Sequence, residues 1–268
     1  MNQLRDNLKA LGLSPNHIFQ QVKDAIGEDL AGGKDLTSVA TIPDTHVVTA
    51  DFTARTSGVV CGLHVVAAVL EYCVVNHYEV LVDEGAKVSV GKVLITAQGN
   101  TQKILLAERT ALNFLSHLSG ISTLTNQWVS EISGTKCQIR DTRKTTPGLR
   151  MLEKFAVRMG GGVNHRLSLS QAALIKDNHI MAAGSISDAF NAIKKMYPDK
   201  SIEIEVDSID QLKEAITLKP DLILLDNMST DQCSEAVSIT NGLVKLEASG
   251  GIAISNAKAY AATGVDYL

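Results

Sequence analysis

Hydrophobic positions in the first 100 residues follow two different periods. Residues 2–11 and 16–26 carry apolar side chains at helical spacing, which predicts two short amphipathic helices. The segments that follow are rich in β-branched residues and are broken by glycines, which predicts a small sheet. A helix over residues 63–75 is expected to pack against it. The expected strands span residues 47–55, 58–62, 80–85 and 88–95.

Residues 101–132 return to the helical period. Their apolar side chains recur every three or four positions, which predicts either one long helix or two helices meeting near Gly120. Arg109 lies beside this apolar stripe. Taken alone, such an arginine is more typical of a surface side chain that extends its charge into water than of a ligand.

From residue 137 onward, strand patterns alternate with helix patterns. This alternation is typical of parallel βα units and predicts an α/β fold for this half of the chain. The expected strands are residues 137–139, 172–175, 202–206, 222–225, 244–246 and 265–268. The expected helices are residues 151–159, 186–196, 208–218, 230–240 and 255–262.

Acidic residues recur at equal intervals where three of these strands end, at Glu205, Asp226 and Glu247. In a βα barrel the carboxyl ends of the strands carry the active site. The alternative is that acids cap the helices that follow. A functional role is favoured, because Asp226 and Glu247 precede the expected helix starts.

Composition and charge narrow the function. The chain has 268 residues, 45% of them hydrophobic, and a net charge of −4, which argues against a nucleic-acid-binding protein. The most apolar window, residues 58–75, is interrupted by His64 and Glu71, so no membrane span is expected. The four cysteines form no C-x-x-C pair, and the N-terminus has scattered charges without an apolar core. A reduced, cytoplasmic protein is therefore expected.

Against this acidic background, residues 141–150 form a basic stretch, D-T-R-K-T-T-P-G-L-R, preceded by Arg140. Guanidinium groups bind carboxylates and phosphates through two hydrogen bonds, whereas a lysine acts as a point charge. Arg143 and Lys144 are the expected anion-binding residues, and Arg150, which heads the next helix, is expected to be structural. The alternative is a solvated basic loop.

The predicted layout brings this stretch to the same edge as other polar segments. Residues 164–166 (N-H-R) follow three glycines, residues 176–179 (K-D-N-H) end a strand, and residues 249–251 (S-G-G) lead into a helix. Glycine amides before a helix are typical of a phosphate site. Carboxylates facing the same cavity would repel phosphates unless Mg²⁺ joins the two. We therefore expect a phosphorylated, Mg²⁺-bound substrate beside a second anion, although each group alone has a structural explanation.

Six motifs, in this order, resemble quinolinate phosphoribosyltransferases: E-R-T-A-L-N-F-L-S-H-L-S-G-I, D-T-R-K-T-T-P-G-L-R, G-G-G-V-N-H-R-L-S-L-S, L-I-K-D-N-H, L-L-D-N-M and E-A-S-G-G-I. The resemblance begins near Glu28 and runs to the end of the chain. It implies an N-terminal α/β sandwich domain (residues 1–118) and a C-terminal open α/β barrel like a TIM barrel (residues 119–268). It also implies homodimers, assembled into hexamers in some members.

The reaction implied is transfer of phosphoribose from phosphoribosyl pyrophosphate to quinolinate with loss of CO₂, giving nicotinate mononucleotide and pyrophosphate in NAD biosynthesis. Mg²⁺ is implied at Glu205 and Asp226, and no organic cofactor is. The catalytic residues implied are Lys144, Lys176, Glu205 and Asp226. The substrate-binding residues implied are Arg109 (from the partner subunit), Arg143, His165, Arg166, Glu247, Ser249, Gly250 and Gly251.

The chain departs from the family pattern at residues 169–171, where little effect is expected, and at residues 265–268. Family members continue there with a phosphate loop and a closing helix, so the barrel is expected to be C-terminally truncated. Two alternatives stay open: a phosphoribosyltransferase-fold protein that acts on another substrate, such as a mono-acid, and a non-catalytic nucleotide-binding relative.

Overall fold

The computed structural model describes residues 2–268. Contacts divide the chain into two compact units, one built from residues up to 126 and residues 146–161, the other from residues 127–145 and 162–268. The predicted domain boundary at residues 118–119 stays a prediction. None of the helices in the described residues is both long and apolar enough to cross a membrane.

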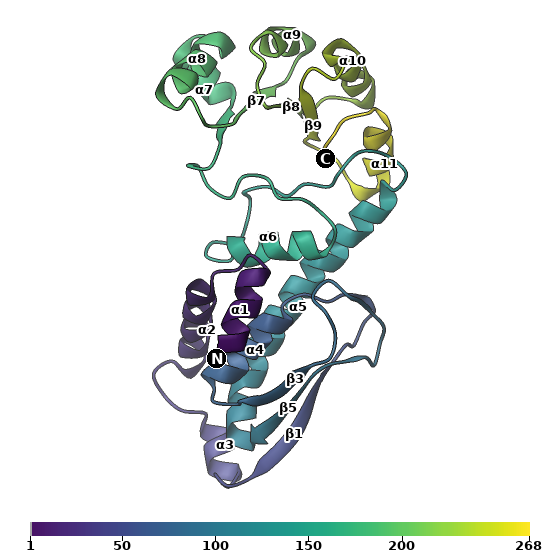
Figure 1. The fold of residues 1–268 in the computed structure, drawn as a ribbon. Coiled ribbons are helices and arrows are strands. Elements are labelled where there is room, and N and C mark those ends of the chain that lie inside the picture. The colour runs from purple at the N-terminus through teal and green to yellow at the C-terminus, as the bar shows by residue number, and fades with distance from the viewer. Residues whose placement is uncertain (1) are drawn as a thin grey trace. The chain divides into compact units, whose positions relative to one another are not determined.

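The first unit is an α/β sandwich whose central sheet is antiparallel, in the order β1-β5-β3, with a separate β2-β4 pair (Figure 1). Helices α1 and α2 pack on α4, whose side chains are buried along most of its length. Its helices are α1 (Asn2–Ala10), α2 (Pro15–Leu30), α3 (Leu36–Thr41), α4 (Leu63–Tyr72), α5 (Thr101–Glu131) and α6 (Arg150–Met159). Its strands are β1 (Val47–Thr53), β2 (Gly58–Val59), β3 (His77–Val80), β4 (Lys87–Val88) and β5 (Val93–Asn100).

Local signals account for the helix starts in this unit. The Ser14 hydroxyl accepts a hydrogen bond from the amide of His17, and a proline occupies the first helical position of α2. Helix α3 was not expected from the sequence, but the Asp35 carboxylate caps it at the amide of Ser38. Helix α5 runs without a break through Gly120, so of the two arrangements that the sequence left open, the structure has the single long helix.

Two expected strands have the wrong bounds. Residues 81–85 lie in a turn after β3, and the strand expected at residues 88–95 is found at β5, five residues further on. Gly85 and Gly91 have positive φ angles, which end extended structure. The buried Glu84 carboxylate also accepts bonds from the amides of Gly62 and His64, so this turn is held at the start of α4.

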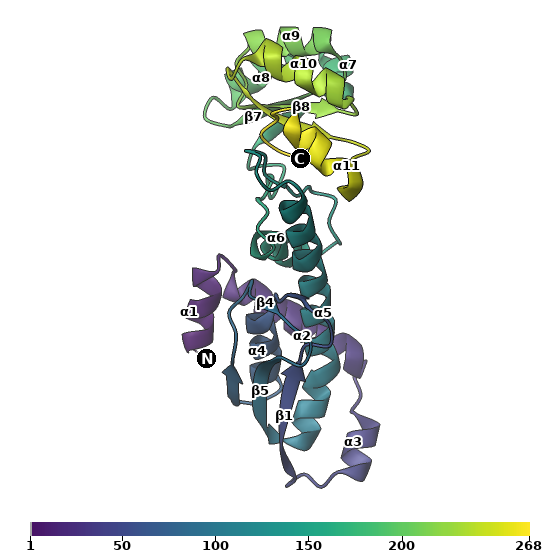
Figure 2. The same cartoon turned by 90° about the vertical axis from the view of Figure 1, so that its right-hand side faces the viewer.

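The second unit contains a parallel sheet in the order β6-β7-β8-β9 (Figure 2). Its strands are β6 (Ala173–Ile175), β7 (Ile202–Val206), β8 (Leu222–Asp226) and β9 (Lys245–Ser249). Its helices are α7 (Asp177–Ala183), α8 (Ile186–Met196), α9 (Ile209–Thr217), α10 (Thr230–Thr240) and α11 (Ile254–Ala262). Helix α7 was not expected, because the sequence pattern ended the strand without a helical period.

Single bridges continue this sheet beyond β9. Tyr267 pairs in parallel with Glu247 and with Gln138, and Arg140 pairs with Val163. The segments expected as strands at residues 137–139 and 265–268 are therefore present at the expected places, but as bridges. The bridged segments therefore run from β6 through β9 to Tyr267, Gln138 and Val163. Within the described residues Val163 is not bridged to β6, so the ring of strands is open between these two, as in an open α/β barrel.

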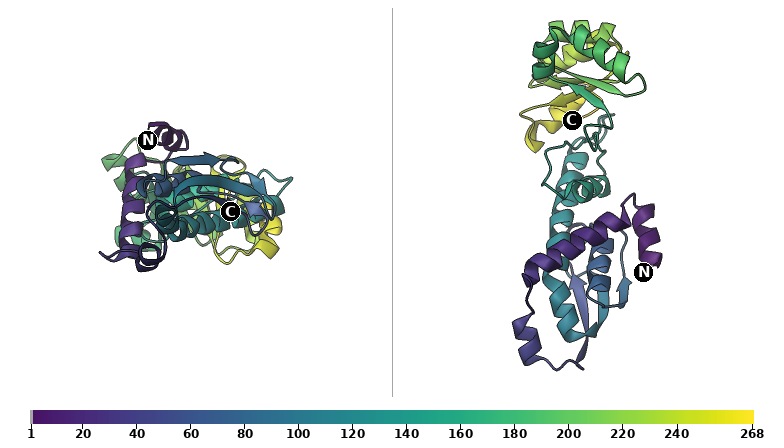
Figure 3. Two further views of the ribbon diagram at one scale, coloured as in Figure 1. Left: turned by 90° about the horizontal axis from the view of Figure 1, so that it is seen from below. Right: turned by 90° about the vertical axis from the view of Figure 1, so that its left-hand side faces the viewer.

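The two faces of the parallel sheet differ in chemistry because side chains alternate along each strand. One face is apolar and contributes residues such as Ile204, Ile223 and Leu246 to the core of this unit. Figure 3 shows the helices that lie over one side of the sheet. The opposite face carries Glu203 and Glu205 on β7, and it also carries Asp226 at the end of β8 with Glu247 and Ser249 on β9. This second face holds the candidate site.

Candidate active site

The carboxyl ends of β7, β8 and β9 bring the predicted acidic residues to one edge of the sheet. Glu205 is in register with Leu224, which is in register with Glu247, and Asp226 is in register with Ser249 one level further along. Glu205 and Asp226 are half-buried. Glu247, by contrast, lies in the middle of β9 and is 4% exposed, so the expectation that it ends a strand is wrong.

Glu247 forms an ion pair with Arg140. The guanidinium Nη1 of Arg140 donates to Glu247 Oε2 at 2.6 Å, and the same guanidinium lies 4.8 Å from the ring centre of Tyr267. Burial and the neighbouring Glu203 raise the pKa of Glu247, and Arg140 opposes that shift. This pair stabilises the interior of the sheet, and a direct contact between Glu247 and a substrate stays a prediction.

Lys176 and Glu205 form a second, more open pair at the strand ends. Lys176 is the residue before α7, and its Nζ donates to Glu205 Oε2 at 2.8 Å. The lysine side chain is 46% exposed and the glutamate 16%. The ammonium group is thus accessible to a ligand, while the carboxylate beside it keeps it in place.

His165 is buried and has partners at both ring nitrogens. Its Nε2 lies 2.8 Å from Glu203 Oε2, and its Nδ1 accepts the backbone N–H of Arg166 at 2.7 Å. The Asp141 carboxylate accepts from the amide of His165 and from the side chain of Asn164. This loop is therefore held by carboxylates from two directions.

Two arginine side chains next to His165 retain buried donors. Arg143 Nε and Arg166 Nε are buried and have no hydrogen-bond partner, although Arg166 Nη1 donates to the carbonyl of Ala172 at 2.7 Å. Burial and the like charge of Arg143 lower the pKa of Arg166. Buried donors without partners are rare in native proteins, and two positive groups side by side indicate a site for an anion.

The Asp226-Asn227 turn shapes the segment predicted to bind phosphate. Asn227 has a φ of 53°, donates from its side chain to Asp226 at 2.9 Å, and donates from its backbone to the carbonyl of Ser249 at 2.8 Å. Gly250 lies against Asn227 with a φ of 91°, and Gly251 follows with a φ of 63°. The Ser249–Gly251 segment therefore has a backbone conformation that favours glycine.

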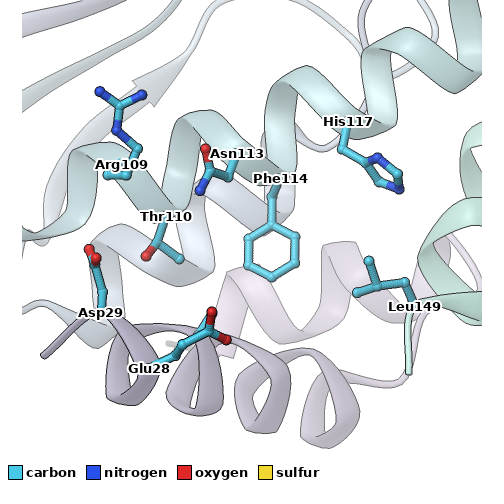
Figure 4. Close-up of a pocket in the computed structure, with 9 residues that line it drawn as sticks. Glu28, Asp29, Arg109, Thr110, Asn113, Phe114, His117 and Leu149 are labelled. Carbon is cyan, nitrogen blue, oxygen red and sulfur yellow. The ribbon is translucent and has the colours of Figure 1, made fainter. Parts of the chain in front are cut away.

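Two further predicted side chains, those of Lys144 and Arg109, lie on exposed surfaces of their own units. Lys144 is exposed, and its backbone amide donates to Thr142. Arg109 is exposed on α5 in the first unit, where it lines a pocket of about 420 Å³ between α2 and α5 (Figure 4). The other lining residues are Ala25, Glu28, Asp29, Thr110, Asn113, Phe114, His117 and Leu149.

Two sets of side chains in the second unit offer possible metal ligands. His165, Glu203 and Glu247 have ligand atoms within 4.8 Å of one another, but His165 is hydrogen-bonded to Glu203, and Arg140 neutralises Glu247. Glu205 and Asp226 are half-buried carboxylates at the open edge of the sheet. Mg²⁺ prefers oxygen ligands and is commonly held by one or two carboxylates together with substrate phosphates, so this second pair fits Mg²⁺ better.

Sequence reasoning missed Glu203 and Asp141 as members of this cluster. Glu203 is 6% exposed, and it lies two residues before Glu205 on the same face of β7. The alternation I-E-I-E-V could have revealed it, because a strand with isoleucines on one side must place both glutamates on the other. Asp141 could be recognised only from its tertiary contacts with Asn164 and His165.

Comparisons with known proteins agree with this architecture. Residues 35–119 match the family model described as "Quinolinate phosphoribosyl transferase, N-terminal domain". Residues 121–268 match the one described as "Quinolinate phosphoribosyl transferase, C-terminal domain". The chain is 49% identical to the nicotinate-nucleotide pyrophosphorylase [carboxylating] of Mycobacterium leprae over 92% of this chain and 89% of that protein. It is 42% identical to a probable nicotinate-nucleotide pyrophosphorylase [carboxylating] of Synechocystis over 83% and 77%.

Solved structures give the same result. The structure of the nicotinate-nucleotide pyrophosphorylase from Francisella tularensis superposes with a TM-score of 0.89 at 40% identity, covering 94% of this chain and 89% of that one. That of the enzyme from Ehrlichia chaffeensis does so with a TM-score of 0.89 at 40% identity, covering 92% and 90%. The chain therefore belongs to the quinolinate phosphoribosyltransferase family.

Proposed function

We propose that this protein transfers phosphoribose from phosphoribosyl pyrophosphate to quinolinate and decarboxylates the product, as a pentosyltransferase of NAD biosynthesis. The observation that supports this most strongly is the half-buried arginine pair, Arg143 and Arg166, whose buried Nε donors have no partner among the described residues, in the unit that also carries Glu205 and Asp226. A dicarboxylate needs several fixed cations, and a ribose centre that develops positive charge needs carboxylates. The second unit of this chain contains both the cations for the dicarboxylate and the carboxylates for the ribose.

Quinolinate is bound by the cationic side of the site. Arg143 and Arg166 are assigned to its carboxylates, since each retains a buried donor, and Lys176 supplies a third, more accessible charge. His165 was expected to contact the substrate as well. Because both of its ring nitrogens are engaged, its role is better described as holding Arg166 in position.

Phosphoribosyl pyrophosphate is bound by the acidic edge and the glycine segment. Ser249, Gly250 and Gly251 are assigned to the 5′-phosphate, because backbone amides in positive-φ conformations form concave anion sites. Glu205 and Asp226 face the ribose. Lys144, which is exposed, and Lys176 are assigned to the pyrophosphate.

The reaction then proceeds in two steps. The pyridine nitrogen forms a bond to C1 of the ribose as the bond from C1 to pyrophosphate oxygen breaks, with its electron pair leaving on pyrophosphate. Glu205 and Asp226 stabilise the oxocarbenium-like charge that develops at C1. The bond to the 2-carboxyl group then breaks to release CO₂. The electron pair left on C2 is stabilised by the adjacent positive nitrogen and takes up a proton.

Mg²⁺ would be held by Glu205 and Asp226 together with substrate oxygens, and when bound it would neutralise charge on the leaving pyrophosphate. The protein groups present fit this ion, as oxygen ligands at an open edge. No organic cofactor is proposed.

The active assembly is proposed to be a cytoplasmic homodimer, further assembled into hexamers in some members of the family. Arg109 belongs to the first unit, whereas the other assigned residues belong to the second, which is compatible with its delivery by a partner subunit. The four free, buried cysteines fit a reducing compartment.

The test is a reaction with quinolinate labelled with ¹³C in the 2-carboxyl group, together with phosphoribosyl pyrophosphate and Mg²⁺. One labelled CO₂ should be released for each nicotinate mononucleotide formed. Consumption of nicotinate but not of quinolinate would instead identify an enzyme for a mono-acid. Binding of both substrates without product would identify a non-catalytic nucleotide-binding protein.

A further inference from the structure

The buried glutamate on β7, Glu203, has no role in the mechanism described above. It is in register with Leu174 and Leu222, two residues before Glu205, and is 6% exposed. Burying a carboxylate is unfavourable unless the group is hydrogen-bonded or paired. The partners of Glu203 therefore indicate what the residue is for.

Its main partner is His165, whose ring it holds in one orientation. The amide of Arg166 can only donate, so Nδ1 of His165 must be an acceptor without a proton. The proton of a neutral imidazole then lies on Nε2, which points at Glu203 Oε2 from 2.8 Å. A carboxylate only accepts, so the two bonds agree on one tautomer and one ring orientation.

The effect extends through His165 to Arg166. The backbone of Arg166 is tied to the imidazole, and its Nη1 is tied to the carbonyl of Ala172. Arg166 is thus held at its backbone and at Nη1, and its buried Nε has no hydrogen-bond partner among the described residues. Glu203 also acts on this group through space, because its negative charge opposes the repulsion between Arg143 and Arg166.

We infer that Glu203 is a positioning residue for the reaction. By accepting from His165 Nε2, it fixes the imidazole and the backbone of Arg166, so that Arg166 is held ready for a carboxylate of the dicarboxylate substrate. This inference rests on the proposed function for the identity of that substrate. The orientation of His165 does not depend on the proposed function and can be measured separately.

A matched pair of substitutions separates positioning from simple stability. In Glu203→Gln the amide oxygen still accepts from Nε2, whereas Glu203→Met fills a similar volume without an acceptor. Glu203→Met should raise the KM for quinolinate by about 10- to 100-fold, the effect of misplacing a binding group. The KM for phosphoribosyl pyrophosphate should stay unchanged in both variants, and Glu203→Gln should remain close to the wild type in the KM for quinolinate.

Nitrogen-15 NMR of histidine-labelled protein gives the second measurement. The His165 signal is assigned by its loss in His165→Asn. The wild type and Glu203→Gln should show only the tautomer with the proton on Nε2. Glu203→Met should show a mixture, because without an acceptor at Nε2 the ring can turn away from the Arg166 amide. An unchanged tautomer in Glu203→Met, or a lower unfolding midpoint with an unchanged KM for quinolinate, would overturn the inference. If the wild type does not turn over quinolinate, the proposed function fails, and the NMR spectra alone decide whether Glu203 orients His165.

Discussion

Gly250 offers a sharp test of how the phosphate-binding segment is built. Its φ is 91°, and a Cβ atom placed on it would overlap Asn227 Oδ1 and lie 2.6 Å from Asn227 Cγ and 3.0 Å from Asn227 N. The side chain of Asn227 could rotate, but its backbone cannot move freely, because that amide donates to Ser249 at 2.8 Å. Gly250→Ala must therefore distort the turn that carries Asp226.

The neighbouring Gly251 provides the control. Its φ is 63°, also in the left-handed region, but no heavy atom lies within 4 Å of a Cβ placed there. Gly251→Ala should therefore cost only the conformational strain, about 1–2 kcal/mol. Gly250→Ala adds steric overlap worth about 1–3 kcal/mol, so its total should be roughly 2–5 kcal/mol.

Urea unfolding followed by tryptophan fluorescence measures this difference. The chain has a single tryptophan, Trp128, which packs against the core of the second unit. Gly250→Ala should also raise the KM for phosphoribosyl pyrophosphate by about 10-fold or more, because a hydrogen bond to a charged group contributes about 1.5–3 kcal/mol. The KM for quinolinate should not change. Equal destabilisation by the two substitutions would refute the steric argument, and an unchanged KM for phosphoribosyl pyrophosphate would refute the phosphate assignment.

Three further predictions concern the Arg140–Glu247 pair, the roles of Arg143 and Glu205, and the buried cysteines. Arg140→Met should destabilise the protein by about 3–5 kcal/mol, and the double variant with Glu247→Met should recover most of this loss, because the single change leaves a buried charge unpaired. Burial raises the pKa of Glu247 above its usual 4.5, so folding takes up a proton there and stability falls as pH rises through the raised pKa. The destabilisation by Arg140→Met should therefore be smaller in urea titrations at acid pH. Equal destabilisation at every pH would contradict this reasoning. Arg143→Ala should raise the KM for quinolinate by about 10- to 100-fold, whereas Glu205→Ala should lower kcat by about 100- to 1,000-fold; steady-state kinetics yielding the opposite pattern would exchange the two roles. Burial raises the pKa of Cys73 and Cys233 to about 11 and that of Cys137 to about 12, and it raises the pKa of Cys61 further. At pH 8 a thiol reagent should therefore label no cysteine in the native protein and all four after unfolding. Rapid labelling of the native protein would show that these sites open.

The sequence pattern alone predicted the parallel α/β half of the chain well. Strands and helices alternate there with strong periodicity, and β7 and β8 lie close to their expected bounds. The weaker half was the small sheet, where the expected strand at residues 80–85 proved to be a turn. The interactions that decide that turn come from Glu84 to Gly62 and His64, about twenty residues away, and local propensity does not report such contacts.

The candidate site shows the same division. Residue type and position at strand ends are enough to point to Glu205, Asp226, Lys176 and the basic stretch at residues 141–150. The pairing of these groups could not be predicted, because burial depends on which segments meet in space. Arg140 illustrates this point: it looked like one more anion-binding cation, yet the structure pairs it with Glu247 at 2.6 Å.

By itself, then, the sequence determined the fold class, the family and the chemical character of the site, because periodicity and motif spacing are local properties of the chain. Only the tertiary structure decided which charges neutralise one another inside the sheet and which remain available to a ligand. The role of Glu203 could be seen only in the tertiary structure, because its partner His165 lies 38 positions earlier in the chain and contacts it only in the folded protein. Hydrogen-bond geometry acts over about 3 Å, and no one-dimensional pattern carries that information.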